Sequence, residues 1–253
     1  MPLRSYLDGR VFAEVSDGPG PLFAGLHGWG RDRNDLRTAL AKYRRILVDL
    51  PGFGLSAPPR AAWGAAEYAA CVAAVLEQHQ PGEPAVVVGH SFGGRVAVCL
   101  AAARPDLVRG LVLCSVPLLR DSGAAVPPLG YRMARRAHRL GLLSGQRFEI
   151  IRRGSGSDDF NAASGVMREV LVRVVNEAYD AQLGAITCPV ALLWGSADQA
   201  VPPSVASHAS ALLPAPAVTE IVDGAGHDVH LQAPARLSAL AGQIAAASRV
   251  PSC

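Results

Sequence analysis

The chain has 253 residues, of which 50% are hydrophobic and 18% are charged, so it can bury a large core and is not a disordered protein. Its length suits one large α/β domain with room for an inserted subdomain. A net charge of +3 and a pI near 8.7 fall short of the basic surface expected of a nucleic-acid-binding protein.

Membrane and metal signals are missing from the sequence. No run approaches the roughly 18 apolar residues of a membrane span, and the first residues lack the apolar centre of a signal peptide. The five cysteines are scattered and form no C-x-x-C pair, which predicts neither a zinc site nor a disulfide framework. We expect a soluble cytoplasmic protein with no transmembrane segment and no cofactor, of unknown oligomeric state.

Apolar runs and helical patterns alternate along most of the chain. We expect three short strands within residues 3–26, and further strands at 45–50, 85–88, 108–114, 189–194 and 217–222. Helices are expected at 31–43, 61–80, 92–103, 203–213 and 234–247. This order predicts an α/β fold with a mostly parallel eight-stranded sheet and helices on both faces. Functional groups of such sheets lie beyond the carboxyl ends of the strands.

Residues 117–187 interrupt this alternation. They contain no strand-like run, are rich in arginine, and show helical patterns at 131–140 and 164–179. We therefore predict a core of residues 1–116 and 188–253, with 117–187 inserted after the sixth strand as a helical lid over Ser91. The expected apolar lining of the pocket under this lid is Leu140, Leu142, Leu143, Phe148 and Ile150.

The strongest motif follows the strand at 85–88. Gly89-His90-Ser91-Phe92-Gly93 fits G-x-S-x-G and is followed by the predicted helix at 92–103. A sharp turn between strand and helix would expose the Ser91 hydroxyl at the top of the sheet and place its backbone N–H at the start of a helix. Ser91 is therefore the candidate nucleophile, and the alternative is an ordinary glycine-rich turn.

A serine nucleophile needs a base and an orienting carboxylate, which follow it in the order acid, then histidine, in such sheets. Asp198 is the only carboxylate in the loop after the strand at 189–194, and His227 lies in the glycine-rich loop after the last strand. His230 is a rival for the base, but it lies nearer the final helix, so we favour His227.

An oxyanion hole requires two N–H donors. One is expected from Phe92, the residue after the nucleophile, and the other from Trp29 in His27-Gly28-Trp29-Gly30. Trp29 could equally be a packing aromatic or a wall of the acyl pocket. The residues expected to contact a substrate are His27, Gly28, Trp29, His90, Leu142, Leu143 and Phe148.

With these motifs the sequence resembles the α/β-hydrolase superfamily over nearly its whole length. The matching segments are 27–30, 49–56, 89–94, 194–202 and Gly226-His227. Within the superfamily the chain is most similar to small bacterial carboxylesterases with a helical lid, including the pimeloyl-carrier-protein methyl ester esterases, which share the His-Gly-Trp-Gly loop. The resemblance implies Ser91 as nucleophile, Asp198 and His227 as its partners, and Trp29 and Phe92 as oxyanion donors.

Arg132, Arg135, Arg136 and Arg139 share one face of the predicted helix at 131–140. The simpler interpretation is a solvated helix face. The functional alternatives are a patch for an acidic substrate or carrier protein and, more weakly, a membrane surface.

The sequence therefore predicts a serine hydrolase that cleaves a carboxylic ester or thioester, acidic or carrier-linked esters included, through an acyl-enzyme. A non-hydrolytic protein of the same fold, such as a lyase or a small-molecule receptor, and a carbon–carbon bond hydrolase remain alternatives.

Overall fold

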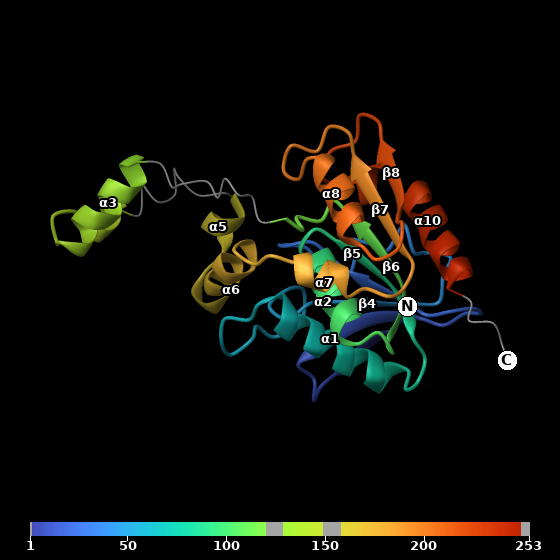
Figure 1. Ribbon diagram of the computed structural model, residues 1–253. Helices are drawn as coiled ribbons and strands as arrows, with labels where there is room; N and C mark the ends of the chain where they lie inside the picture. The colour runs from blue at the N-terminus through green and yellow to red at the C-terminus, as the bar shows by residue number, and fades with distance from the viewer. Residues whose placement is uncertain (1, 120–128, 149–157, 249–253) are drawn as a thin grey trace.

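The computed structural model describes residues 2–119, 129–148 and 158–248 and contains one sheet of eight strands (Figure 1). The strands are β1 Leu3–Tyr6, β2 Val11–Ser16, β3 Phe23–Leu26, β4 Arg45–Val48, β5 Ala85–His90, β6 Val108–Cys114, β7 Val190–Gly195 and β8 Val218–Val222. Their order in the sheet is β1-β2-β4-β3-β5-β6-β7-β8. β2 pairs antiparallel with both β1 and β4, and every other pair is parallel. The fold is the mostly parallel α/β sheet that the sequence predicts.

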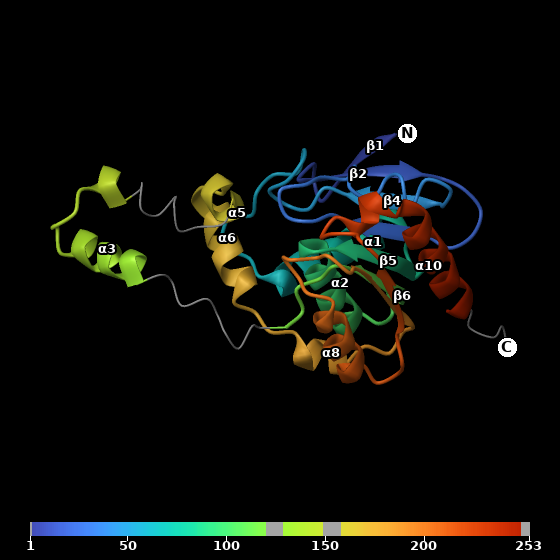
Figure 2. The same ribbon diagram turned by 90° about the horizontal axis from the view of Figure 1, so that it is seen from above.

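The described helices are α1 Ala65–His79, α2 Phe92–Ala103, α3 Leu129–Arg139, α5 Asp158–Ala162, α6 Gly165–Val175, α7 Asp180–Gly184, α8 Ser204–Leu212, α9 Val229–Gln232 and α10 Pro234–Ala247. The helices α1 and α2 lie on one side of the sheet and α10 on the other (Figures 1 and 2). The bounds of α10 match the prediction, because Pro234 starts the helix and apolar residues recur every three or four positions after it.

Two hydrophobic cores, one on each face, follow from the alternation of side chains along the strands. Val87 of β5 and Leu111 of β6 belong to the core that includes α1 and α2. Val86 and Val88 of β5 point the other way, into the core that includes α10. Every residue of β5 is buried, which explains why this strand reads as a continuous apolar run.

The parallel register brings the carboxyl ends of the central strands to one edge of the sheet. Leu26 of β3 is paired with Gly89, and His90 of β5 with Cys114. Through β7, the same edge reaches Gly195 and its partner Val222 in β8. The loops after β3, β5, β7 and β8 therefore meet at one edge, as predicted for a functional site.

The helix expected at 31–43 is wrong, because this segment is a series of turns. Side chains take the place of helical carbonyls as partners of the first backbone N–H groups. The N–H of Arg33 donates to Asp49 Oδ1 over 2.8 Å, and that of Asn34 donates to Asp32 Oδ1 over 2.8 Å. Such side-chain acceptors compete with helix formation.

Between β6 and β7 the described residues form the helices α3, α5, α6 and α7 and a helical turn at 145–148, and they include no strand. In Figures 1 and 2, α3 stands apart from the sheet, whereas α6 lies closer to α1 and α2. The short helix α7 packs against α2 and α8. Ile150 falls outside the described residues. That the whole of 117–187 acts as a lid stays a prediction.

Within the described residues, no helix is both long and apolar enough to cross a membrane. Cys71, Cys99, Cys114 and Cys188 are free thiols. Burial raises the pKa of the Cys71 thiol to about 11, so this group is protonated at neutral pH. The cytoplasmic location stays a prediction.

Candidate active site

Ser91 lies at the turn between β5 and α2 in a strained backbone conformation, with φ of +48° and ψ of −111°. A non-glycine residue at positive φ costs about 1–3 kcal/mol and is held only by its surroundings. Close packing supplies that hold, since a Cβ on Gly93 would lie 2.2 Å from the carbonyl oxygen of Leu26. The turn therefore has the strand–turn–helix geometry that the G-x-S-x-G motif predicts.

A chain of hydrogen bonds links Ser91 to a histidine and a carboxylate. His227 Nε2 lies 3.1 Å from Ser91 Oγ, and His227 Nδ1 lies 3.0 Å from Asp198 Oδ2. In this arrangement Nδ1–H donates to the carboxylate and leaves the Nε2 lone pair free to accept the serine proton. The His227 side chain is 30% exposed, so the imidazole can be reached from solvent.

Backbone groups fix the carboxylate of this chain. Asp198 is buried, and its Oδ1 accepts hydrogen bonds from the N–H groups of Ala200 and Val201 over 3.0 and 2.8 Å. These bonds leave Oδ2 directed at His227. The rival base His230 is buried on α9 and bonds to Asp35, so the structure brings His227 to Ser91.

The backbone N–H groups of Trp29 and Phe92 belong to the two segments that meet at the Ser91 turn. Within the part of the chain that the structure describes, neither Trp29 N–H nor Phe92 N–H has a hydrogen-bond partner. The loop that carries Trp29 is joined to the start of α2, because Gly93 N–H donates to the carbonyl oxygen of His27 over 3.0 Å. The sequence predicted these two residues as oxyanion donors, and the free N–H groups are compatible with that role.

His27 is buried, and both of its ring nitrogens are used inside the protein. Its Nδ1 donates to the carbonyl oxygen of Gly28 over 2.7 Å, and its Nε2 accepts the N–H of Leu50 over 3.0 Å. Burial lowers the pKa of His27 below its usual value and keeps the ring neutral, as an acceptor Nε2 requires. His27 therefore holds the loop that carries Trp29, and the expectation that it touches substrate does not agree with this geometry.

His90 and Gly28 are buried as well. His90 Nδ1 lies 3.1 Å from Asp35 Oδ2, and its Nε2 lies 3.2 Å from the carbonyl oxygen of His227. Gly28 is needed for close approach, because a Cβ there would lie 2.7 Å from His90 Nδ1. Both residues are buried against neighbouring protein groups, so their contact with a substrate stays a prediction.

An aromatic cluster flanks the same site. The ring centroid of Trp29 lies 4.9 Å from that of Phe53 and 5.3 Å from that of Phe92, both edge to face. Trp29 and Phe53 are half-buried, so they offer an apolar surface next to the unpaired N–H groups. Phe53 was missed from the sequence, where residues 49–56 read as a structural turn.

The three residues expected from the lid lie elsewhere in this structure. Leu142 is 78% exposed, and Leu143 and Phe148 are half-buried in the segment that follows α3, apart from the sheet (Figure 1). Phe148 stacks on the ring of His138, with 4.7 Å between centroids. They do not line the surroundings of Ser91 here, and their contact with substrate stays a prediction.

A buried arginine ties the inserted segment to the nucleophile helix. Arg95 of α2 donates through Nε to the carbonyl oxygen of Pro117 over 2.9 Å and through Nη1 to that of Val174 over 2.7 Å. Both acceptors belong to residues 117–187, one at its start and one at the end of α6. The residue four positions after Ser91 therefore anchors the part of the insertion that packs on the core.

Comparison with known proteins agrees with this geometry. A family described as "Alpha/beta hydrolase family" matches residues 24–240. The chain belongs to the α/β-hydrolase family.

Within this family the chain is similar to proteins with different names. It is 30% identical over 243 residues to the magnesium-chelatase 30 kDa subunit of Rhodobacter capsulatus, which covers 85% of this chain and 84% of that protein. It is 34% identical over 119 residues to a pimeloyl-[acyl-carrier protein] methyl ester esterase of Shewanella sp., over 44% of this chain and 42% of that one. The crystal structure of the esterase RhEst1 from Rhodococcus sp. superposes with a TM-score of 0.69 and 25% identity, over 98% of this chain and 100% of that chain. The expected resemblance to α/β-hydrolase esterases is thereby confirmed, whereas the lid and the substrate stay predictions.

Proposed function

We propose that this α/β-hydrolase is a serine hydrolase that cleaves a carboxylic ester or thioester through an acyl-enzyme. The observation that carries the proposal is the hydrogen-bonded series Asp198–His227–Ser91. The N–H groups of Trp29 and Phe92, which have no hydrogen-bond partner among the described residues, support it. The esterases among its relatives favour the same chemistry.

Acylation uses the groups in that order. Ser91 Oγ attacks the carbonyl carbon while His227 Nε2 takes the hydroxyl proton, and the Asp198 carboxylate stabilises the imidazolium that forms. Negative charge develops on the carbonyl oxygen, where the N–H groups of Trp29 and Phe92 donate to it. When the tetrahedral intermediate collapses, His227 gives its proton to the departing alcohol or thiol.

Deacylation reverses the roles. His227, now neutral, takes a proton from water, and the hydroxide that forms attacks the acyl carbon of the Ser91 ester. The same two N–H groups stabilise the second oxyanion. Collapse releases the carboxylic acid and returns the proton to Ser91 Oγ, so the cycle needs no cofactor.

The substrate class follows from the surroundings of Ser91. The half-buried rings of Trp29 and Phe53 offer an apolar wall, which suits a small-molecule ester with an apolar acyl group. An acidic or carrier-linked ester is the alternative that the arginines of α3 would favour.

Hydrolysis of a series of p-nitrophenyl esters of increasing acyl length tests the proposal. Ser91→Ala is expected to lower kcat by about 10⁴-fold or more, because the nucleophile is lost. Ser115→Ala is the matched control, since Ser115 is a buried serine at the end of the neighbouring strand β6, also at positive φ. Ser115→Ala should retain kcat within about threefold, because Ser115 takes part in no proposed chemical step and its substitution affects only local packing. No turnover of any ester by the wild-type protein, or a drop under tenfold for Ser91→Ala, would overturn the proposal.

A further inference from the structure

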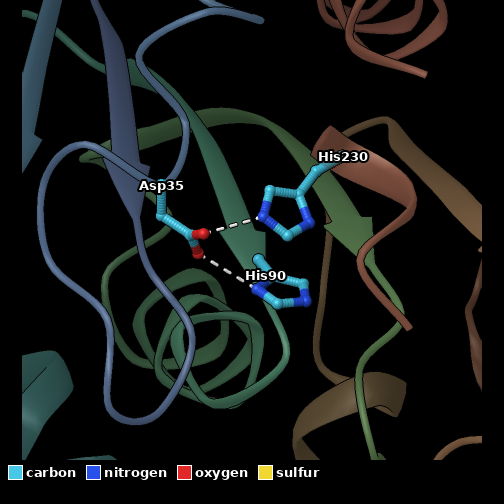
Figure 3. A group of neighbouring side chains, drawn as sticks. All are labelled: Asp35, His90 and His230. Carbon is cyan, nitrogen blue, oxygen red and sulfur yellow. Dashed lines mark hydrogen bonds and ion pairs between the residues drawn. The ribbon is translucent and has the colours of Figure 1, made fainter. Parts of the chain in front are cut away.

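A second buried group consists of one carboxylate, Asp35, and two histidines, His90 and His230 (Figure 3). It lies next to His227, whose ring centroid is 5.2 Å from that of His90. Asp35, His90 and His230 are 7%, 1% and 1% exposed. Asp35 Oδ1 lies 2.8 Å from His230 Nε2, and Asp35 Oδ2 lies 3.1 Å from His90 Nδ1. No step of the proposed reaction uses these residues, so the cost of burying them needs another explanation.

Asp35 is the centre of this group, because each of its oxygens has two partners. Oδ2 also accepts the backbone N–H of Gly28 over 3.0 Å, and Oδ1 also accepts Arg31 Nη1 over 3.1 Å. Burial alone raises the pKa of Asp35, but the hydrogen bonds from His230 and His90 outweigh it and lower the pKa below the usual range. Asp35 is therefore an anion that accepts four hydrogen bonds.

The four donors come from the loops that carry the proposed functional groups. Gly28 directly precedes Trp29, the proposed oxyanion donor. His90 directly precedes Ser91, and its Nε2 lies 3.2 Å from the carbonyl oxygen of His227.

The other two donors reach the loop of the base. His230 belongs to α9, which begins two residues after His227. Arg31 bonds to Asp35 and, through Nη2, to Asp228 Oδ1 over 2.5 Å. One carboxylate thus connects the oxyanion loop, the nucleophile turn and the loop of the base.

A divalent cation is the alternative occupant of this group, because its three ligand atoms lie within 4.8 Å of one another. Two contacts argue against it. Arg31 already places a positive charge against Asp35 Oδ1, and the N–H of Gly28 occupies Oδ2. Hydrogen bonding satisfies the carboxylate without a metal ion.

We propose that Asp35 is a positioning residue that fixes the oxyanion loop relative to the His227 loop, so that both meet the same carbonyl group. This proposal rests on the proposed function. Misplacing catalytic groups by about 1 Å can cost about 10²-fold in rate. Substituting Asp35 should weaken stabilisation of the transition state and leave substrate binding unchanged, since Asp35 is buried beneath the site and touches no substrate.

The test compares Asp35→Asn with Asp32→Asn on a p-nitrophenyl ester. Asn is nearly isosteric with Asp but cannot accept all four hydrogen bonds. Asp32 is the matched control, because it lies in the same turns and is partly exposed. Rates are expressed per Ser91 titrated by a fluorophosphonate, so that unfolded protein does not count.

We expect Asp35→Asn to lower kcat by about 10²-fold, to leave KM within about threefold, and to weaken inhibition by phenylboronic acid by a factor close to that in kcat. A purely structural role would lower the unfolding temperature and the titrated fraction, yet leave kcat per titrated site unchanged. An Asp35→Asn kcat equal to that of Asp32→Asn would overturn the proposal. Stoichiometric zinc in the purified protein, measured by mass spectrometry, would overturn it too.

A second pair of variants decides the matter if Asp35→Asn fails to fold. His230→Leu removes the donor to Oδ1, and His230→Gln restores an N–H there, so kcat should fall about tenfold in the first and recover in the second. Equal kcat values for the two would contradict the proposal. Failure of the proposed function is a different result, since the wild-type protein would then hydrolyse no ester at all.

Discussion

The loops around Ser91 and the segment of α3 are built under opposite constraints. Around Ser91, backbone atoms approach so closely that a single Cβ at Gly93 would clash, and Asp198 and His227 are hydrogen-bonded in sequence. On α3, Met133 is 64% exposed, and Arg135, Arg136 and Arg139 are exposed as well. The proposed chemistry thus depends on a closely packed, rigid sheet edge, whereas the exposed surface of α3 lies outside it.

The largest effect is expected from a substitution in the loops around Ser91. Asp198→Asn should lower kcat for a p-nitrophenyl ester by about 10⁴-fold, because an amide at this position favours the wrong tautomer of His227. Steady-state kinetics on the purified variant checks this. Asp223→Asn is the control, since Asp223 bonds to Ser196 at the surface and should leave kcat unchanged. Similar rates for both variants would remove Asp198 from the proposed triad.

A smaller effect is expected where the two regions are joined. Arg95→Met removes the hydrogen bonds that the Arg95 side chain donates to the carbonyl groups of Pro117 and Val174, of which Val174 still accepts the N–H of Glu177. The free energy of unfolding should fall by about 2–4 kcal/mol. Chemical denaturation measures this, with Arg109→Met as the control, because Arg109 is only partly buried and donates to the carbonyl oxygen of Ser248 after α10. Equal losses in the two variants would mean that Arg95 does not anchor the insertion.

Acidification should lower the free energy of unfolding moderately through His27, which lies in the rigid loops. Since burial lowers the pKa of His27, the folded protein holds this ring neutral, whereas the unfolded chain protonates it below about pH 6.5. The unfolded state then binds more protons, so the free energy of unfolding falls as the pH falls below 6.5, by at most about 1.4 kcal/mol per pH unit for this one group. Urea midpoints between pH 7 and 5 should fall less steeply for His27→Gln than for His208→Gln, a change at an exposed histidine. Parallel slopes would show that His27 is not held neutral.

The smallest effect is expected on α3. Replacing Arg135, Arg136 and Arg139 by Glu should leave KM for a small neutral ester within about twofold, because exposed charges contribute little at a distance in salt. KM of the same variant should also be measured with an anionic or carrier-linked ester. A KM that rises only for the anionic ester, and less so at high salt, would show a recognition patch. If KM changes by the same factor for both esters, the arginines form only a solvated helix face.

The sequence predicted the rigid region well, because its motifs encode steric requirements. Gly89 to Gly93 demand a tight strand–turn–helix, and Asp198 is the only carboxylate in the loop that directly follows β7. The helices at 92–103 and 234–247 followed from apolar spacing and from Pro234. Each of these signals lies within a few residues of the feature it specifies.

What the sequence did not reveal depends on contacts between distant residues. Asp35 read as part of a helix, yet its partners His90 and His230 lie 55 and 195 positions away. Phe53 joins Trp29 only through the fold. The surroundings of α3 could not be predicted either, because an amphipathic helix rich in arginine does not specify which surface it will meet.

Intact-mass measurement after treatment with a fluorophosphonate tests directly whether Ser91 is a nucleophile activated by His227. We expect one adduct per chain, located on the peptide that contains Ser91. It should form fast in the wild-type protein and at least about 10²-fold more slowly in His227→Ala, because the serine then lacks its base. No adduct on the wild-type protein, or labelling of Ser91 that does not depend on His227, would contradict an activated serine at this site.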